Sequence, residues 1–345
     1  MNIALAHFRV GETDGVSLEM EKWRKELEEM GHNVIYISGT DNYGEVCIPE
    51  INLRRMEFKK WEKNAYVNLE DYENERDFEA DVLKETDIIE KKLRKVVEKY
   101  HLDMIIPNNI FSLGVGYPVS KAFKNVIEEY GLKVISHNHD FYWERPYFAN
   151  PTCDLVKRWQ DELFPPHGKN YQQVVINKIA QKNLKSRKNL DSTVVPNVFD
   201  FHEAVWEIDD YNFDFRKNLG LSESDIVFLQ ATRVSERKAI ELAVEVIGEI
   251  QRRKDELLGT LYNGKKFEKE NRIVLLMPGM IESLGGYTDF LKDVAKNEKV
   301  EILWINEIMD FKRFYRNGKK VYSLWDTYVN SDFLYLSLRN QVRMA

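Results

Sequence analysis

The chain has 345 residues, enough for two domains with separate hydrophobic cores, because a single core rarely keeps growing beyond roughly 250–300 residues. Its formal net charge of −7 and its pI near 5.7 exclude a general nucleic-acid binder, whose phosphate contacts need a basic face. Any cationic binding site must therefore be a local one.

The cysteines and the N-terminal residues indicate a cytoplasmic protein. Cys47 and Cys153 are too few for a disulfide framework and lack zinc-finger spacing, so we expect reduced thiols and no metal centre. Residues 1–6 lead into His7 and Arg9 without a basic leader, and no window reaches the roughly 18 apolar residues of a membrane span. We therefore expect no transmembrane segment and no nucleic-acid partner.

The first part of the chain alternates short apolar runs with amphipathic segments. After the apolar run at 3–6 and a loop at 9–15, helical spacing covers 16–30, and Gly31 ends it as a left-handed C-terminal glycine. Further strands are expected at 34–37, 104–106, 134–136, 174–176 and 193–195, and helices at 79–100, 119–130 and 177–188. This alternation predicts an α/β domain over residues 1–198, with a parallel sheet covered by helices on both faces.

A second α/β series is expected over residues 199–345, after a Pro-, Asn- and Asp-containing linker that begins at Pro196. Strands are expected at 226–230, 272–277, 300–304 and 333–336, and helices at 239–252, 287–295 and 322–330. Residues 253–271 are highly charged and contain glycines, which predicts an exposed excursion rather than core.

Three motifs carry candidate chemistry, and the first is the loop of Gly11, Asp14 and Gly15. It lies between the first expected strand and helix, where glycines let a ligand approach the backbone and the helix N-terminus attracts phosphate or a polar sugar. The six-residue dinucleotide fingerprint is absent, so the alternative is a plain turn.

The second motif is residues 136–145, which gather His137, His139, Asp140, an arginine and three aromatic residues just past an expected strand. Open α/β sheets place their ligand-binding groups at this end of a strand. We interpret the segment as a sugar-contacting loop. The two histidines could also bind a metal, but no third ligand is apparent.

The third motif is Arg233 and Lys238, which follow the apolar run 226–229 and precede the helix expected from 239. A planar guanidinium and a point charge beside a helix N-terminus are suited to a diphosphate. The alternative is a pair of solvated cations beside Glu236 and Glu241.

Taken in chain order, these segments resemble the family 4 retaining glycosyltransferases with the GT-B fold. The resemblance rests on the glycine loop, the His-Asp loop, residues 193–200, Arg233 with Lys238, and residues 325–332. It implies two Rossmann-like domains facing across a cleft, the N-terminal one binding the acceptor and the C-terminal one the nucleotide sugar. It also implies transfer of a hexose from a UDP- or GDP-sugar to a sugar-containing or small acceptor, with retention and without a cofactor.

The resemblance also assigns roles to residues. His139, Arg233 and Lys238 are expected to be catalytic: His139 contacts the transferred sugar, and the two cations stabilise the diphosphate as the sugar–phosphate bond breaks. Gly11, Asp14, Gly15, His137, Asp140 and Asn197 are expected to bind substrate. Recognition of the base is expected around 305–307, where the polar residues could equally form a turn.

One departure from the family concerns residues 339–345, which replace the expected Glu-Gly-x-Gly turn and second glutamate. This predicts a truncated second domain that lacks its last strands and helix, with residues 333–336 as a sheet edge open to self-association. The alternative function is a non-catalytic remnant or subunit that needs a separate C-terminal segment. A sugar-nucleotide epimerase explains the linker and the two cations less well.

Overall fold

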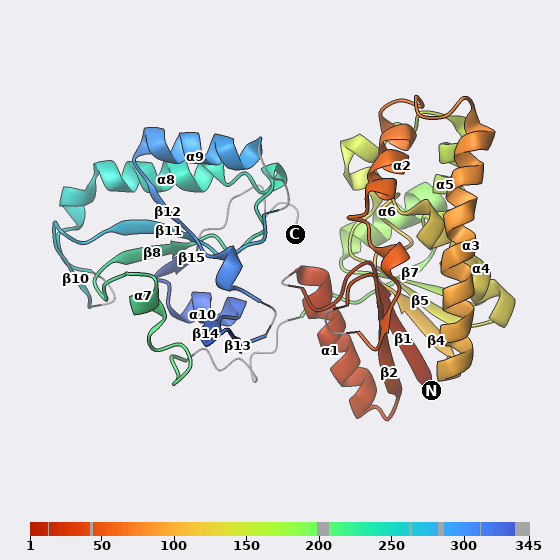
Figure 1. Cartoon of the computed structure of the whole chain (residues 1–345), viewed down its shortest axis with the longest axis horizontal. Coiled ribbons are helices and arrows are strands. Elements are labelled where there is room, and N and C mark those ends of the chain that lie inside the picture. The colour runs from red at the N-terminus through yellow and green to blue at the C-terminus, as the bar shows by residue number, and fades with distance from the viewer. Residues whose placement is uncertain are drawn as a thin grey trace. The chain divides into compact units, whose positions relative to one another are not determined.

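The computed structural model describes residues 1–12, 14–41, 44–198, 207–261, 264–281, 286–310 and 312–334. The chain divides into two compact units, Met1–Phe199 and Asp200–Ala345, called here the N-terminal unit and the C-terminal unit (Figure 1). In the described part of the chain, no helix is both long enough and apolar enough to span a bilayer.

The N-terminal unit is built on a sheet of parallel strands in the order β3-β2-β1-β4-β5-β6-β7. The strands are β1 (Asn2–His7), β2 (Asn33–Ser38), β3 (Val46–Cys47), β4 (Met104–Pro107), β5 (Lys133–Asn138), β6 (Tyr171–Val175) and β7 (Ser192–Val194). The helices are α1 (Gly15–Glu29), α2 (Met56–Tyr66), α3 (Glu75–Tyr100), α4 (Tyr117–Tyr130), α5 (Asp154–Leu163) and α6 (Lys178–Lys188), with the short 3-10 helices η1 (Pro49–Ile51), η2 (Tyr142–Glu144) and η3 (Pro146–Phe148).

Helices cover both faces of this sheet, as the sequence predicts. Successive residues of a strand point to opposite faces. Ala4 and Ala6 of β1 accordingly belong to the core that α2, α3, α4 and α5 cover, whereas Ile3 and Leu5 pack in the core beneath α1. The predicted stop of the first helix is also confirmed, since Gly31 has a left-handed backbone with φ of 83°.

The C-terminal unit repeats this plan with a sheet in the order β12-β11-β8-β15, again parallel. Its strands are β8 (Ile226–Leu229), β11 (Ile273–Met277), β12 (Glu301–Trp304) and β15 (Phe333–Leu334), and two hairpins join β9 (Gly259–Thr260) to β10 (Lys266–Phe267) and β13 (Phe314–Arg316) to β14 (Lys319–Val321). Its helices are α7 (Phe215–Asn218), α8 (Glu241–Arg252), α9 (Tyr287–Glu298) and α10 (Leu324–Val329), with the 3-10 helices η4 (Glu236–Lys238), η5 (Lys254–Leu257) and η6 (Asn306–Ile308).

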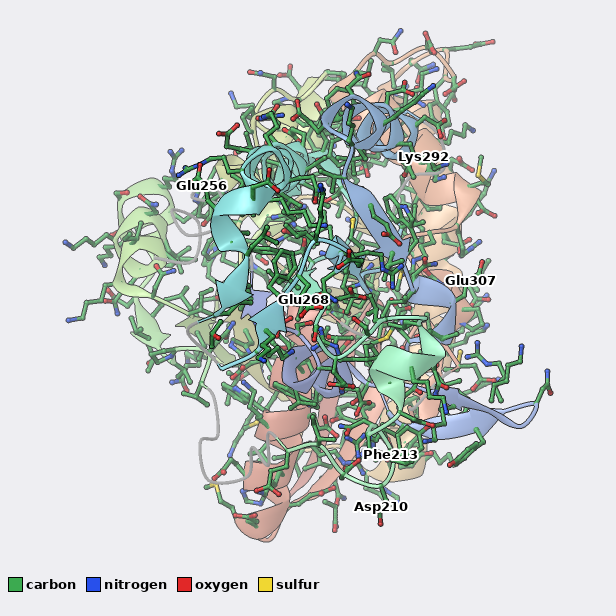
Figure 2. The ribbon with its side chains drawn as sticks, turned by 90° about the vertical axis from the view of Figure 1, so that its left-hand side faces the viewer. Asp210, Phe213, Glu256, Glu268, Lys292 and Glu307 are labelled. Atoms are coloured by element: carbon green, nitrogen blue, oxygen red, sulfur yellow. The ribbon has the colours of Figure 1, made fainter. Side chains whose placement is uncertain are left out.

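One prediction for this unit needs correction. The charged stretch 253–271 contains η5 and the β9–β10 hairpin, and Phe267 is fully buried in the core beneath α8 and α9. Figure 2 shows Glu256 and Glu268 of this stretch on the surface, so the excursion is exposed in part only. Of the strand predicted at 333–336, residues 335 and 336 lie outside the described residues.

Candidate functional site

The sheet order of the N-terminal unit creates a topological switch point between β1 and β4. From β1 the chain continues to β2 and β3 on one side, and β4 to β7 occupy the other. Open parallel sheets bind ligands just beyond the carboxyl ends of their strands at such a point. The residues at the ends of β1, β4 and β5 there form what we call the histidine cluster: His7, Asn108, Asn109, His137 and His139.

Hydrogen bonds to the two asparagines fix His7 and His139. The Nδ1 atom of His7 lies 2.7 Å from the Asn108 carbonyl oxygen, which can only accept, so Nδ1 carries the proton. The Nε2 atom of His139 lies 3.1 Å from Asn108 Oδ1, and the His139 backbone N–H donates to Asn109 Oδ1 at 2.8 Å. His139 Nε2 is then the donor, and its Nδ1 is left as an acceptor.

Both rings are neutral near physiological pH. Burial lowers the pKa of His7 to about 4 against an opposing effect of Asp14. Burial also lowers the pKa of His139 to about 4, and His7 adds to that effect. A neutral His139 can hydrogen-bond a sugar hydroxyl without a desolvated charge.

His137 lies deeper than the sequence suggests, with 1% of its surface exposed. Its ring centroid lies 4.5 Å from that of Trp23 and 4.2 Å from that of His139. Neither ring nitrogen has a hydrogen-bond partner in the described part of the chain, and burial lowers its pKa to about 2. His137 thus packs against His139 with the two rings tilted by 40°, and its contact with substrate stays a prediction.

The glycine loop leads from β1 to α1. Gly11 has φ of 74°, a left-handed backbone that glycine adopts without strain. Gly15 is under no such steric demand, since a Cβ at this position would meet no atom within 4 Å. Asp14 caps α1, accepting hydrogen bonds from Val16 N at 3.1 Å and Ser17 Oγ at 3.0 Å. Its carboxylate is therefore committed to the helix end, and its predicted role in binding substrate stays untested.

Two ion pairs border the histidine cluster. Asp140 accepts a hydrogen bond from Asn109 Nδ2 at 3.0 Å and pairs with Arg145. Arg54 binds Glu12 through two hydrogen bonds of 2.9 and 2.7 Å. The sequence motifs pointed to Asp140 but missed His7, Asn108, Asn109 and the Glu12–Arg54 pair. The rule that ligand groups follow strand ends would have found the two asparagines, because they come directly after β4.

In the C-terminal unit, Arg233 and Lys238 lie between β8 and α8, in the order the sequence predicts. The connection is longer than a direct turn, since Lys238 ends η4 and Ala239 has a left-handed backbone with φ of 49°. The helix predicted from residue 239 is therefore wrong at its start, because a left-handed residue cannot continue a right-handed helix. The regular helix begins at Glu241.

The loop after β11 supports the Arg233 segment. Val234 forms a parallel bridge with Ile281, and its N–H donates to the Met280 carbonyl at 2.8 Å. A Cβ on Gly279 would lie 1.8 Å from Thr232 O and 3.0 Å from Arg233 Cα. Glycine at 279 is thus a steric requirement for the two loops to meet, which the sequence motifs missed.

The acidic residues near the end of the chain serve the structure. Asp326 is fully buried, accepts a hydrogen bond from Ser323 N at 2.7 Å and pairs with Arg313 at 2.5 Å. Asp332 accepts from Val227 N at 2.8 Å and pairs with Lys265 at 2.7 Å. These contacts hold α10 and β15 in the unit, so neither carboxylate is available as a metal ligand.

The remaining predicted residues differ in their exposure. Asn197 is exposed on the segment after β7. Of residues 305–307, Ile305 is buried, and Glu307 on η6 is exposed, as Figure 2 shows. Within the described residues, no group of three or more His, Cys, Asp or Glu side chains is arranged to hold a metal ion.

Two relatives match nearly the whole chain. It is 40% identical over 336 residues to the mannosylglucosylglycerate synthase of Petrotoga mobilis, in an alignment that covers 97% of this chain and 76% of that protein. It is 36% identical over 343 residues to the mannosylglucosylglycerate synthase of Thermotoga maritima, covering 97% of this chain and 74% of that protein. No protein-family model matches the chain.

Solved structures show the fold. Sucrose-phosphate synthase from Thermosynechococcus elongatus superposes with a TM-score of 0.55 at 11% identity, over 88% of this chain and 70% of that one. WaaG, a glycosyltransferase involved in lipopolysaccharide biosynthesis, gives a TM-score of 0.54 at 10% identity, over 96% of this chain and 74% of that one. The fold is GT-B, as the resemblance predicts.

Proposed function

The chain belongs to the mannosylglucosylglycerate synthase family, and we propose on that basis that it transfers a mannosyl residue from a UDP- or GDP-mannose to glucosylglycerate. The observation that carries the proposal is 40% identity along 97% of the chain. The product is the one that the relatives' name gives, and a nucleotide sugar is the donor that the glycosyltransferase resemblance implies. Because the relatives match along nearly the whole chain, the non-catalytic alternative is not favoured.

In this proposal, Arg233 and Lys238 bind the diphosphate of the donor. Negative charge grows on the leaving diphosphate as the sugar–phosphate bond breaks, so fixed cations stabilise the transition state more than the ground state. The close packing of Gly279 against Thr232 and Arg233 supports this role, because it holds the cation-bearing loop in one position. Two cations in place also allow the reaction to proceed without a divalent metal.

His139 is proposed to contact the transferred mannosyl group. Its Nε2–H is bound to Asn108, which leaves Nδ1 as an acceptor for a sugar hydroxyl. Its lowered pKa keeps it neutral at the pH of the reaction, and the His137 ring packs against it at a tilt of 40°. Transfer is proposed to retain the anomeric configuration of the donor.

The test is a transfer assay with the purified chain, glucosylglycerate, and GDP-mannose, UDP-mannose, GDP-glucose and UDP-glucose in turn. The proposal expects one of the two mannose donors to give mannosylglucosylglycerate, and NMR of the product reads its anomeric configuration. Efficient transfer from a glucose donor alone, or donor hydrolysis without a disaccharide product, would refute it.

A further inference from the structure

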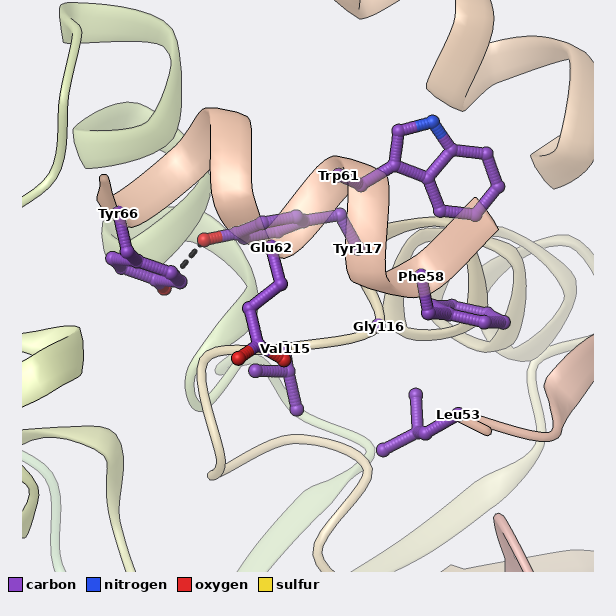
Figure 3. Close-up of a pocket in the computed structure, with 8 residues that line it drawn as sticks. All are labelled: Leu53, Phe58, Trp61, Glu62, Tyr66, Val115, Gly116 and Tyr117. Carbon is purple, nitrogen blue, oxygen red and sulfur yellow. Dashed lines mark hydrogen bonds between the residues drawn. The ribbon is translucent and has the colours of Figure 1, made fainter. Parts of the chain in front are cut away.

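The hollow between α2 and the start of α4 is part of the hydrophobic core. Its aromatic lining is only 2–7% exposed and consists of Phe58, Trp61, Tyr66 and Tyr117 (Figure 3). Its free space of about 20 Å³ holds a single water molecule at most. The hollow is too small for a ligand ring, and a hydrogen-bonding group open to a ligand is found instead on the half-buried His139.

Asn108, which contacts His139, has a rigid place in the sheet directly after β4. Its backbone N–H donates to the Ala6 carbonyl of β1 at 2.7 Å, and the residue forms a parallel bridge with His137 of β5. Only 1% of its surface is exposed. Asn108 is therefore held between β1 and β5, and its side chain has little room to move.

The amide of Asn108 has one orientation. Its Nδ2 lies 3.1 Å from the Ile106 carbonyl oxygen, which can only accept a hydrogen bond, so the amide nitrogen must face Ile106. Oδ1 then faces His139, at 3.1 Å from the Nε2 atom of the ring. Because Oδ1 can only accept, the proton of the neutral ring lies on Nε2, and Nδ1 keeps its lone pair. Among the described residues, Nδ1 has no hydrogen-bond partner.

The amide also adds no charge to a ring that already has charged neighbours. The titratable groups around His139 are the side chains of His7, Asp14, Lys22, His137 and Asp140. Burial lowers the pKa of His139 to about 4, against the opposing effect of the two carboxylates. A carboxylate at position 108 would contact the ring itself, and an opposite charge that close typically raises a pKa by about 1–3 units. An asparagine keeps the ring neutral where an aspartate would favour the charged form.

Asn109 holds the backbone of His139. Its Oδ1 accepts from the His139 N–H at 2.8 Å and from Ser112 Oγ at 3.2 Å. Its own backbone is left-handed with φ of 58°, a conformation that asparagine adopts more readily than most residues. Since the backbone and the ring are held by different side chains, a substitution at 108 acts on the ring and leaves the backbone anchor in place.

We propose that Asn108 is a positioning residue for His139, which holds the ring neutral with its proton on Nε2 and its Nδ1 ready to accept a hydrogen bond from a substrate hydroxyl group. A charged ring can only donate, so it would lose this acceptor. The identity of the hydroxyl as one of the transferred sugar rests on the proposed function, but the control of tautomer and charge by Asn108 does not.

The test reads the ring directly, by NMR of the full chain with isotope-labelled histidines, of which there are seven. The His139 signals are those lost in His139→Asn. Asn108→Leu removes the acceptor, and Asn108→Asp keeps an acceptor of nearly the same size and adds a charge. The matched control is Asn125→Leu, which breaks a 2.7 Å hydrogen bond to Glu90. His7 is the internal reference, because it donates to the Asn108 backbone carbonyl, which every variant retains.

We expect the wild type to show a neutral His139 with its proton on Nε2 at neutral pH. Asn108→Leu should lower the ratio of this tautomer to the Nδ1–H form about 10-fold, because the N–H loses its acceptor. Asn108→Asp should keep the proton of the neutral ring on Nε2 and raise the pH at which His139 titrates by about 1–3 units. The His7 signals, and all signals of the control, should match the wild type.

A wild-type His139 protonated on Nδ1, or an unchanged tautomer and titration in both Asn108 variants, would overturn the proposal. If Asn108→Leu does not fold, the titration of Asn108→Asp decides alone. In the transfer assay, the acid limb of kcat/KM should move to higher pH in Asn108→Asp, whereas a merely structural role would lower the rate without moving the limb. The expected NMR changes in a wild type and variants without transfer activity would support the role of Asn108 and refute the proposed function.

Discussion

Substitution of Gly279 by alanine tests how closely the two loops of the C-terminal unit must pack for the cations to work. The added Cβ would start 1.8 Å from Thr232 O, and ordinary contact begins at 3.4 Å, so the loops would have to separate by about 1.6 Å. Both neighbours are backbone atoms, which cannot rotate away. A misplacement of about 1 Å can cost ~100-fold in rate, and overpacking typically costs ~1–3 kcal/mol of stability.

The assay is steady-state mannosyl transfer together with titration of GDP and UDP. We expect Gly279→Ala to stay folded but to lose about 100-fold in kcat/KM, with weaker diphosphate binding and unchanged glucosylglycerate binding. Gly44→Ala is the matched control, because its Cβ would make only ordinary contacts of 3.4–3.6 Å. A folded Gly279→Ala protein with diphosphate affinity and transfer within a few-fold of the wild type would show that the position of Arg233 does not matter.

Two further predictions concern stability. In the folded protein the pKa of His7 and of His139 is about 4, below the ordinary value of 6.5. As the pH falls, the unfolded chain therefore binds protons before the folded protein does. The free energy of unfolding should fall as the pH drops from about 6.5 toward 4, by ~3 kcal/mol per histidine. Urea unfolding measured across this pH range should show a smaller loss of stability for His139→Asn than for the wild type, and the same loss as the wild type for His101→Asn, whose histidine is exposed. Equal pH profiles for the wild type and both variants would contradict the burial argument. Asp326→Asn removes a buried carboxylate that caps α10 with Ser323 and pairs with Arg313. Because Arg313 is about a third exposed, solvent weakens this ion pair, and we expect thermal unfolding to show a loss of ~2 kcal/mol in the free energy of unfolding. A change below ~0.5 kcal/mol would mean that the pair contributes little.

The alternating pattern of the sequence predicts both α/β units because strand runs and helix periods are local signals. The same holds for Gly31, where one residue ends a helix. Helix α2 escaped notice although Phe58, Trp61 and Ala65 have helical spacing. The β13–β14 hairpin could have been found, since Asn317-Gly318 is a strong hairpin signal and both residues have positive φ.

Some residues of the candidate site follow from local sequence signals, and others do not. Arg233, Lys238 and His139 stand next to strand ends, so their neighbourhood follows from chain order. The collision that a side chain at Gly279 would cause depends on Thr232 and Arg233, far away in the sequence, and no local pattern carries that information. The commitment of Asp14 to capping α1 is likewise visible only in its hydrogen bonds.

The most direct test of the account is calorimetric titration of GDP and UDP into the wild type, Arg233→Ala and Lys238→Ala. We expect the wild type to bind one of the two diphosphates, and each variant to bind it about 10- to 100-fold more weakly while glucosylglycerate still binds normally. Equal affinity of the three folded proteins for the diphosphate would contradict the assignment of these two cations to the donor site.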